Sequence, residues 1–188
     1  MNLLIFLALT TISVGEVRDT SYQLPSGEQV LRQEVTVRAS SDEVFTAFTT
    51  DAGLRGFAAP VVSMDLRVGG LWESSYDIRK KPGDEGTIKN EVLSYLPGKM
   101  LSIRIKETPA GFPHSDIVKS VWTVMLFEDM GDGTTRVEIS MLPWKRGENW
   151  DEMQSFFRQG NAVVLRNLQT LFTTGPVDWS ATRPLTND

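Results

Sequence analysis

The sequence predicts an α+β fold in which a curved antiparallel sheet wraps around one long C-terminal helix, with two short helices after the first strand. Two observations predict it. Between residues 64 and 142, apolar and polar residues alternate in short runs that glycine and proline turns separate, which is typical of consecutive antiparallel strands. Between residues 150 and 172, apolar residues recur every three or four positions, which indicates a single amphipathic helix.

The first strand and the two short helices come at the start of the domain. Residues 29–37 alternate with period two, as a strand does. Ser40 with Glu43 three residues later is a helix start, because the serine hydroxyl can accept a hydrogen bond from a free amide of the first turn. Val44 to Phe48 then supplies a short amphipathic helix, and Thr50 is a second cap that opens one or two further turns.

The following strands are predicted from their alternation and from the turns between them. Residues 64–68 and 71–78 form a hairpin across Gly69-Gly70, since glycine adopts positive φ without penalty. After a turn at 82–86, the next strands are expected at 87–95, 99–107, 117–127 and 135–142, with a loop at 109–113. Short links between successive strands imply an antiparallel meander.

The C-terminal helix is long enough to cross a whole sheet, about 33 Å for some 22 residues. Gly175-Pro176 ends it, which is the usual order of residues after a helix. A strongly twisted sheet curls, so one helix laid on its concave face does not fill that face everywhere. The sequence therefore predicts a hollow between the helix and the sheet, lined by both.

The N-terminal segment has a different composition. Residues 1–15 carry no charged side chain and include an apolar run at 3–9. This run is too short to span a bilayer, which needs about 20 residues, but it fits the apolar region of a secretory signal. No basic residue precedes that run, and a buried first strand or a misassigned start is the alternative. We expect a signal peptide at 1–15, a linker at 16–29, the ligand-binding domain at 30–175 and a tail at 176–188.

This organisation predicts a periplasmic or secreted protein without a stable membrane anchor in its mature form, with a cytoplasmic location as the alternative. Composition narrows the function further. The absence of cysteine excludes disulfides, thiol nucleophiles and thiolate metal sites, and a single histidine excludes every site that needs two. The net charge of −5 argues against a protein that binds nucleic acid through its phosphates. We expect no metal and no cofactor, and the oligomeric state stays open.

The order of the elements resembles the helix-grip fold of the START-related ligand-binding superfamily, in particular the branch of the Hsp90 ATPase activator C-terminal domains and the polyketide cyclases. The resemblance is carried by residues 34–45, by 65–72 with a glycine pair before Trp72, and by Gly86-Thr87 with the strand and the Leu96-Pro97-Gly98-Lys99 turn that follow. It covers roughly residues 30–172. Residues 53–59 depart from the pattern, because they lack the tryptophan that is common after the second helix.

The resemblance implies a binding cavity but no single chemistry, since its members include carriers, sensors, cyclases and co-chaperone domains. The expected function is the binding of a hydrophobic or aromatic small molecule between the C-terminal helix and the sheet. One alternative is a polyketide cyclase- or dehydratase-like enzyme that uses acid or base residues in the same place. Another is a protein-interaction module like the co-chaperone relatives.

Aromatic residues and one glycine are the first candidates for the lining of the hollow. Trp72 and Tyr76 share one face of their strand because they are four residues apart, and Trp122 lies on a later strand. All three are either ligand contacts or plain core. Phe156 and Phe157 belong to the helix stripe, where one packs on the sheet and the other lies nearer the rim. Gly160 indicates either a close approach of the helix to the sheet or room for a ligand.

Titratable residues are the remaining candidates. Glu91 lies in a strand and, if it faces inward, an apolar hollow would raise its pKa and suit it to acid–base work. Glu73 takes the face opposite to Trp72. Phe112 and His114 lie in the loop at 109–115, which can overhang the hollow. His114 has Ser115 and Asp116 as its immediate neighbours, and three adjacent residues do not converge as a catalytic triad does.

Overall fold

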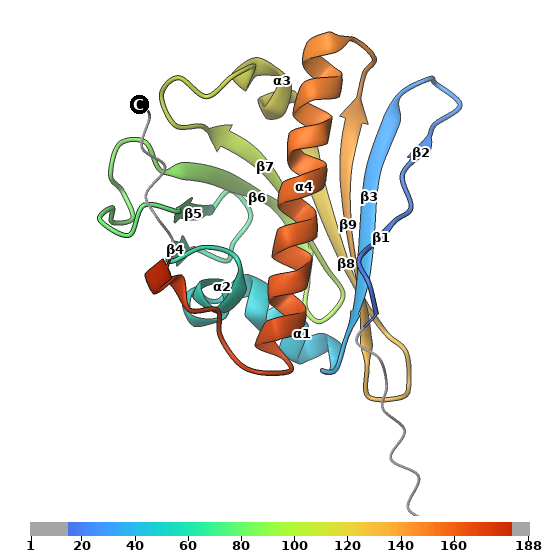
Figure 1. The fold of residues 1–188 in the computed structure, drawn as a ribbon, viewed down its shortest axis with the longest axis vertical. Coiled ribbons are helices and arrows are strands. Elements are labelled where there is room, and N and C mark those ends of the chain that lie inside the picture. Colours follow the sequence, from blue (N-terminus) through green and yellow to red (C-terminus); the bar gives the residue numbers. More distant parts are fainter. Residues whose placement is uncertain (1–14, 182–188) are drawn as a thin grey trace, which may run out of the picture.

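The computed structural model describes residues 15–181 and confirms the predicted α+β fold (Figure 1). Within these residues one antiparallel sheet has nine strands, in the order β1-β3-β9-β8-β7-β6-β5-β4, with β2 also paired to β3. The strands are β1 (Arg18–Asp19), β2 (Tyr22–Gln23), β3 (Gln29–Val37), β4 (Val61–Met64), β5 (Leu71–Ser75), β6 (Ile88–Leu96), β7 (Met100–Glu107), β8 (Trp122–Asp129) and β9 (Thr135–Trp144). The helices are α1 (Ser41–Thr49), α2 (Asp51–Phe57), α3 (Ser115–Ser120), α4 (Glu148–Leu171) and the short η1 (Trp179–Ala181).

The two short helices form where their capping residues predict them. The Ser40 hydroxyl accepts a hydrogen bond from the Glu43 backbone N–H, and the Glu43 carboxylate accepts one from the Ser40 backbone N–H at 2.8 Å. This reciprocal pair satisfies two amides that the first turn of α1 leaves free. The Thr50 hydroxyl caps α2 in the same way, accepting from the Gly53 N–H at 3.2 Å.

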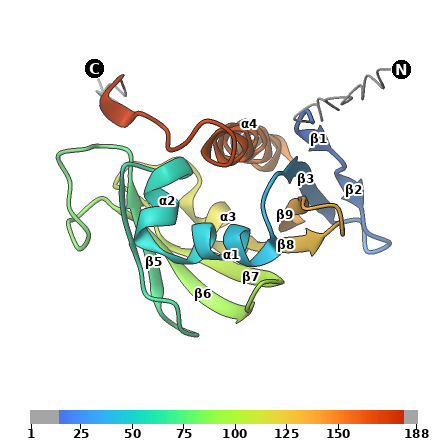
Figure 2. The same cartoon turned by 90° about the horizontal axis from the view of Figure 1, so that it is seen from below.

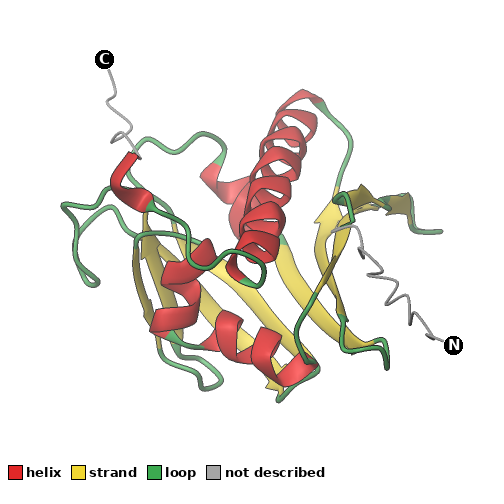
Figure 3. Cartoon of the chain, turned by 60° about the horizontal axis from the view of Figure 1, so that its bottom comes forward, coloured by secondary structure: helices red, strands yellow, loops and turns green. Residues whose placement is uncertain are grey.

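The sheet curls, and α1, α2 and α4 all lie on its concave side (Figures 2 and 3). Helix α4 runs closest to β3 and α2 and has fewer contacts with β9 and α3, so it lies nearer the β3 side of the sheet than the β5 side. In Figure 2, which looks along α4, strands β5 to β9 curve around beneath it while α1 and α2 fill the near end. We call the side of the sheet turned toward α4 its concave face.

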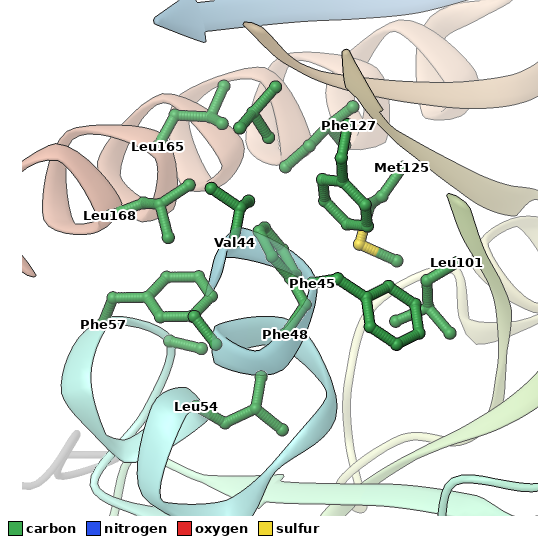
Figure 4. Close-up of a cluster of buried hydrophobic side chains, with 14 of the residues drawn as sticks. Val44, Phe45, Phe48, Leu54, Phe57, Leu101, Met125, Phe127, Leu165 and Leu168 are labelled. Carbon is green, nitrogen blue, oxygen red and sulfur yellow. The ribbon is translucent and has the colours of Figure 1, made fainter. Parts of the chain in front are cut away.

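Buried side chains on the concave side gather in two clusters. The larger joins α1 and α2 to α4 and the sheet, with Phe48 at its centre: its ring lies 4.9 Å from that of Phe57 and 5.1 Å from that of Phe127 (Figure 4). Leu165 and Leu168 of α4 complete it and are fully buried. The second cluster lies at the other end of α4, around Leu31, Val118, Val121, Met141, Trp144 and Met153. The concave side is therefore packed at both ends.

The structure differs from the sequence-based expectations at three places. Residues 16–29, expected as a linker, contribute β1 and β2, which pair with β3. The expected two-residue hairpin at Gly69-Gly70 is a longer connection, because β4 ends at Met64, which pairs with Trp72. Residues 115–120 form α3 although a strand was expected to begin at 117. The predicted signal peptide lies, except for Gly15, outside the described residues and stays a prediction.

Candidate functional site

A strip of uncharged polar side chains lies on the concave face of β5 and β6. Trp72 pairs with Asn90 across the two strands, and Ser74 pairs with Ile88. Asn90 shares its face with Val92, which is fully buried in the cluster beneath α1 and α2, so that face is the concave one. Ser74 lies on the same face as Trp72, and Tyr76 follows one residue after the end of β5, at a bend. We call Trp72, Ser74, Tyr76 and Asn90 the polar strip.

Two members of the polar strip, Ser74 and Asn90, are buried, and within residues 15–181 the strip is only weakly hydrogen-bonded. Ser74 is 9% exposed and Asn90 is 8% exposed. The Asn90 Nδ2 donates to the Trp72 backbone carbonyl at 3.4 Å. The indole Nε1 of Trp72 is buried without a hydrogen-bond partner. Buried polar groups are paired in most folded proteins, so the unpaired Trp72 indole beside a weakly bonded Asn90 indicates a place where another molecule can supply a partner.

Tyr76 lies where the strip meets solvent. It is 41% exposed, yet the surrounding protein removes enough water from its phenol for burial to raise its pKa above the usual value. Tyr76 is therefore positioned at the boundary between the interior and bulk water.

The aromatic residues of α4 lie at its first half, next to α3. The rings of Phe156 and Phe157 are 5.4 Å apart, and the Phe112 ring lies 5.7 Å from Phe156. His114 lies at the start of α3 with positive φ, and its Nε2 is 3.5 Å from the Glu152 carboxylate of α4. The structure thus brings together four of the predicted site residues at the α3 end of α4.

Gly160 follows this aromatic group on α4. A Cβ built on Gly160 would meet nothing within 4 Å, so the backbone of α4 does not approach the sheet closely there. Close packing at this glycine, one of its two interpretations from sequence, is wrong, because Gly160 is exposed on the surface of α4, and the open space beside it is solvent. Gly160 separates the aromatic group from the larger cluster, which includes Leu165.

Two predicted site residues lie on the convex face, away from α4. Glu91 makes ion pairs with Arg104 at 3.5 Å and with Lys106 at 3.7 Å. Trp122 pairs with Arg104 across the strands and is 37% exposed. Neither belongs with Trp72 and Tyr76, because the concave residues of β6 and β8 are the alternate ones.

The carboxylate of Glu73 is also used elsewhere. It accepts a hydrogen bond from the Gly83 N–H at 2.7 Å, within the turn that connects β5 to β6. The two carboxylates considered as acid or base therefore lie off the concave face. Within residues 15–181 no group of histidine and acidic side chains is arranged to hold a metal ion.

Ser74, Asn90 and Gln33 are concave-face residues that reasoning from the sequence missed. Gln33 of β3 is 4% exposed, and its Oε1 is buried without a partner. A signal was present, because Gln33 and Asn90 each have apolar residues two positions before and after them, so a polar side chain lies on the apolar face of the strand. A separate surface groove of about 220 Å³ lies outside this region, between β2, the start of β3 and the side chains of Gln154 and Arg158.

None of the helices in the described part of the chain is both long and apolar enough to cross a membrane. A family model described as "Activator of Hsp90 ATPase homolog 1-like protein" matches residues 38–173. No curated protein matches the sequence.

Several solved structures share the fold. The Aha1 dimer from Colwellia psychrerythraea is 18% identical, with a TM-score of 0.63 over 78% of this chain and 97% of that one. CalU16 from Micromonospora echinospora is 18% identical, with a TM-score of 0.58 over 87% and 88% of the two chains. DynU16, from the dynemicin biosynthetic locus, is 17% identical, with a TM-score of 0.58 over 78% of this chain and 48% of that one.

Proposed function

Because the chain belongs to the family of activator of Hsp90 ATPase homolog 1-like proteins, we propose that it binds an apolar small molecule against the concave face of the sheet, between α4 and the polar strip. Domains of this family and its helix-grip relatives typically bind small ligands. The observation that carries the proposal for this chain is the polar strip itself: within residues 15–181 its side chains make one hydrogen bond, from Asn90 to the Trp72 backbone carbonyl, and the buried Trp72 indole Nε1 has no partner.

The chemistry of the surrounding residues fits an apolar ligand. Beside the strip, Met64 pairs with Trp72 and Val62 pairs with Ser74 on the neighbouring strand. Ile105 pairs with Asn90 on the other side. Burial of ligand surface against such residues contributes about 25 cal/mol per Å², and a few polar groups then orient the molecule.

The enzyme alternative has less support. Proton transfer to a bound substrate needs a titratable group within hydrogen-bond reach. Glu73 and Glu91 point away from the concave face, and His114 lies at the far end of α4 against Glu152. The protein-interaction alternative depends on exposed apolar residues of the convex face: Trp122 and Leu126 share one face of β8 and pair with Leu142 and Met100. Nothing in the described residues shows what would cover them.

The test is a binding titration with N-phenyl-1-naphthylamine, an uncharged probe whose fluorescence rises in apolar surroundings. We expect saturable binding to the wild-type protein and at least about tenfold weaker binding to Ser74→Trp, because the added indole occupies the concave face. Leu126→Trp is the matched control, since Leu126 lies on the convex face and is 41% exposed. Circular dichroism checks that both variants are folded. Equal affinity for the wild type and both variants contradicts the proposed location.

Native mass spectrometry of protein purified from its own cells is the complementary measurement. A co-purifying small molecule that Ser74→Trp no longer carries identifies the natural ligand. An adduct that Ser74→Trp retains but Leu126→Trp loses places binding on the convex face and contradicts the proposal.

We also propose export, from residues 1–15 alone. N-terminal sequencing of the protein from its own cells is the test: a mature chain beginning at Glu16 supports export, and an intact Met1 refutes processing. Such a cut removes the Gly15 carbonyl to which the Gln169 amide donates at 2.7 Å, while the bond from that amide to Thr36 at 3.2 Å remains.

A further inference from the structure

The orientation of the Asn90 amide leaves one acceptor free on the concave face. Its Nδ2 faces the Trp72 backbone carbonyl. A carbonyl oxygen only accepts hydrogen bonds, so the amide nitrogen must be the atom on that side. The Oδ1 therefore points elsewhere and accepts no hydrogen bond from the protein, although the residue is 8% exposed. An inward acceptor of this kind is completed by a donor on a ligand.

A hydroxyl group that can donate lies diagonally across from this acceptor. Ser74 is the diagonal neighbour of Asn90 on the same face, at a spacing of about 7–8 Å between backbones. Within residues 15–181 its hydroxyl makes no hydrogen bond and is free to donate. Tyr76 carries a further hydroxyl, but it lies two residues beyond Ser74, on the side away from Asn90. A single group that both donates to Asn90 and accepts from Ser74 satisfies this pair, and a hydroxyl is such a group.

Charge on the ligand finds no counterpart in the polar strip. None of its four side chains is charged at neutral pH. The nearest carboxylate along β5, that of Glu73, lies on the opposite face and is held by the Gly83 N–H. A carboxylate or an ammonium group that left water for this wall would lose hydration without gaining an ion pair. Recognition by the strip therefore excludes charged groups.

We propose that the polar strip selects an uncharged, apolar molecule bearing a hydroxyl group, which donates to Asn90 Oδ1 and accepts from Ser74. This rests on the proposed function and adds the class of ligand to it. Trp72 adds a donor to the same wall, since its buried indole Nε1–H has no partner within residues 15–181.

The experiment compares three probes with the same ring system: naphthalene, 2-naphthol and 2-naphthoate. At pH 7 the naphthol is neutral and the carboxylate is ionised. Isothermal titration calorimetry with the wild-type protein measures the three affinities. We expect 2-naphthol to bind about tenfold more tightly than either of the other two, which is the usual size of one well-made hydrogen bond together with the penalty of leaving its partner unpaired.

Two variants and a control separate the strip from the rest of the protein. Asn90→Leu and Ser74→Ala each remove one partner, and we expect both to lower the preference for naphthol over naphthalene while leaving naphthalene binding intact. Ser102→Ala is the matched control: Ser102 is as buried as Ser74, at 7% exposed, but lies on the convex face of β7. It should keep the wild-type preference. Ser74→Ala is a mild change, so it serves if Asn90→Leu does not fold.

The outcomes distinguish this inference from the proposed function. Equal affinities of the wild type for naphthalene and 2-naphthol, or a preference that survives both variants, overturns the selection of a hydroxyl while ligand binding stands. Tightest binding of 2-naphthoate overturns the exclusion of charge. If none of the three probes binds saturably, the proposed function fails and this inference fails with it.

Discussion

Replacing Gly160 by alanine should stabilise the protein, which is the opposite of what a close contact between α4 and the sheet would give. Gly160 lies near the middle of α4, twelve residues after its first residue, Glu148, and eleven before its last, Leu171. In a helix interior, alanine is more favourable than glycine by about 0.8–1.0 kcal/mol, because glycine loses more backbone freedom on folding. The full difference applies here, since an added Cβ meets nothing within 4 Å.

A gain of about 1 kcal/mol corresponds to a rise of some 2–4 °C in the melting temperature of a domain of this size. Urea titration followed by circular dichroism at 222 nm measures the free energy of unfolding of the wild type and of Gly160→Ala. Gly53→Ala is the control with the opposite sign: its Cβ would clash with the Ala47 backbone, where α1 and α2 meet. Overpacking of this kind costs about 1–3 kcal/mol.

The result that refutes this reasoning is a loss of stability in Gly160→Ala of the size seen in Gly53→Ala. It would mean that a neighbouring element packs on α4 at this point. An unchanged stability of Gly160→Ala would also contradict the reasoning, because the structure shows no contact that could offset the gain expected from alanine.

Three further outcomes follow from packing, capping and charge. Leu165→Ala should lower the free energy of unfolding by about 2–5 kcal/mol in urea, as expected for a fully buried leucine, and a loss below 1 kcal/mol would contradict the packing in the larger cluster. Ser40→Ala should lower it by about 1 kcal/mol at pH 7. Hydrogen bonds from Ser40 lower the pKa of Glu43 below 4.5, so their stabilisation is present above that pH and is lost as the pH falls. The difference between the wild type and Ser40→Ala should therefore narrow toward pH 3, and a widening would refute it. Arg79→Ala should raise the pKa of Asp77 from about 2 toward 3.8, measured by NMR titration of its carboxyl carbon, and an unchanged value would show that the Arg79 hydrogen bonds are not its cause.

Long periodic segments are the parts of the fold that the sequence predicts well. Helix α4 was expected at 150–172 and is found at Glu148–Leu171, since its apolar residues repeat at helical spacing over six turns. The strand at 29–37 and the two caps at Ser40 and Thr50 are confirmed for the same reason, because each is decided by residues that are neighbours in sequence.

The short helix α3 was missed because its local signals point the other way. Ile117, Val118 and Val121 continue directly into the apolar run of β8, so the whole stretch reads as one strand. The residue that precedes the helix, His114, makes no side-chain cap. Val118 is buried in the second cluster, and α3 contacts α4 and β7. These tertiary contacts stabilise a helix that has no capping signal in the sequence.

The face that each strand turns inward depends on pairing, which alternation within one strand does not reveal. Glu91 and Trp122 illustrate this, since each was placed correctly in a strand. The pairing of β6 with β7 shifts register at two places, between Lys89 and Asn90 and between Val92 and Ser94. Each shift changes which set of alternating residues faces α4, so the assignment made for Trp72 does not carry over to β8. The pairing of β5 with β6 is what puts Trp72, Ser74 and Asn90 on the same face, and the sequence of each strand alone does not reveal it.

Strands β1 and β2 also bear on how the molecule avoids fibril-like self-association. Together they pair with the outer edge of β3, which would otherwise have free backbone groups. β1 pairs with Gln33 and Glu34, β2 pairs with Gln29 and Val30, and the Thr20 N–H donates to the Arg32 carbonyl. Unpaired margins of long strands recruit strands from other chains. A form that lacks residues 1–23 would expose this row of β3 amides and carbonyls. Its copies would then tend to pair edge to edge through β3.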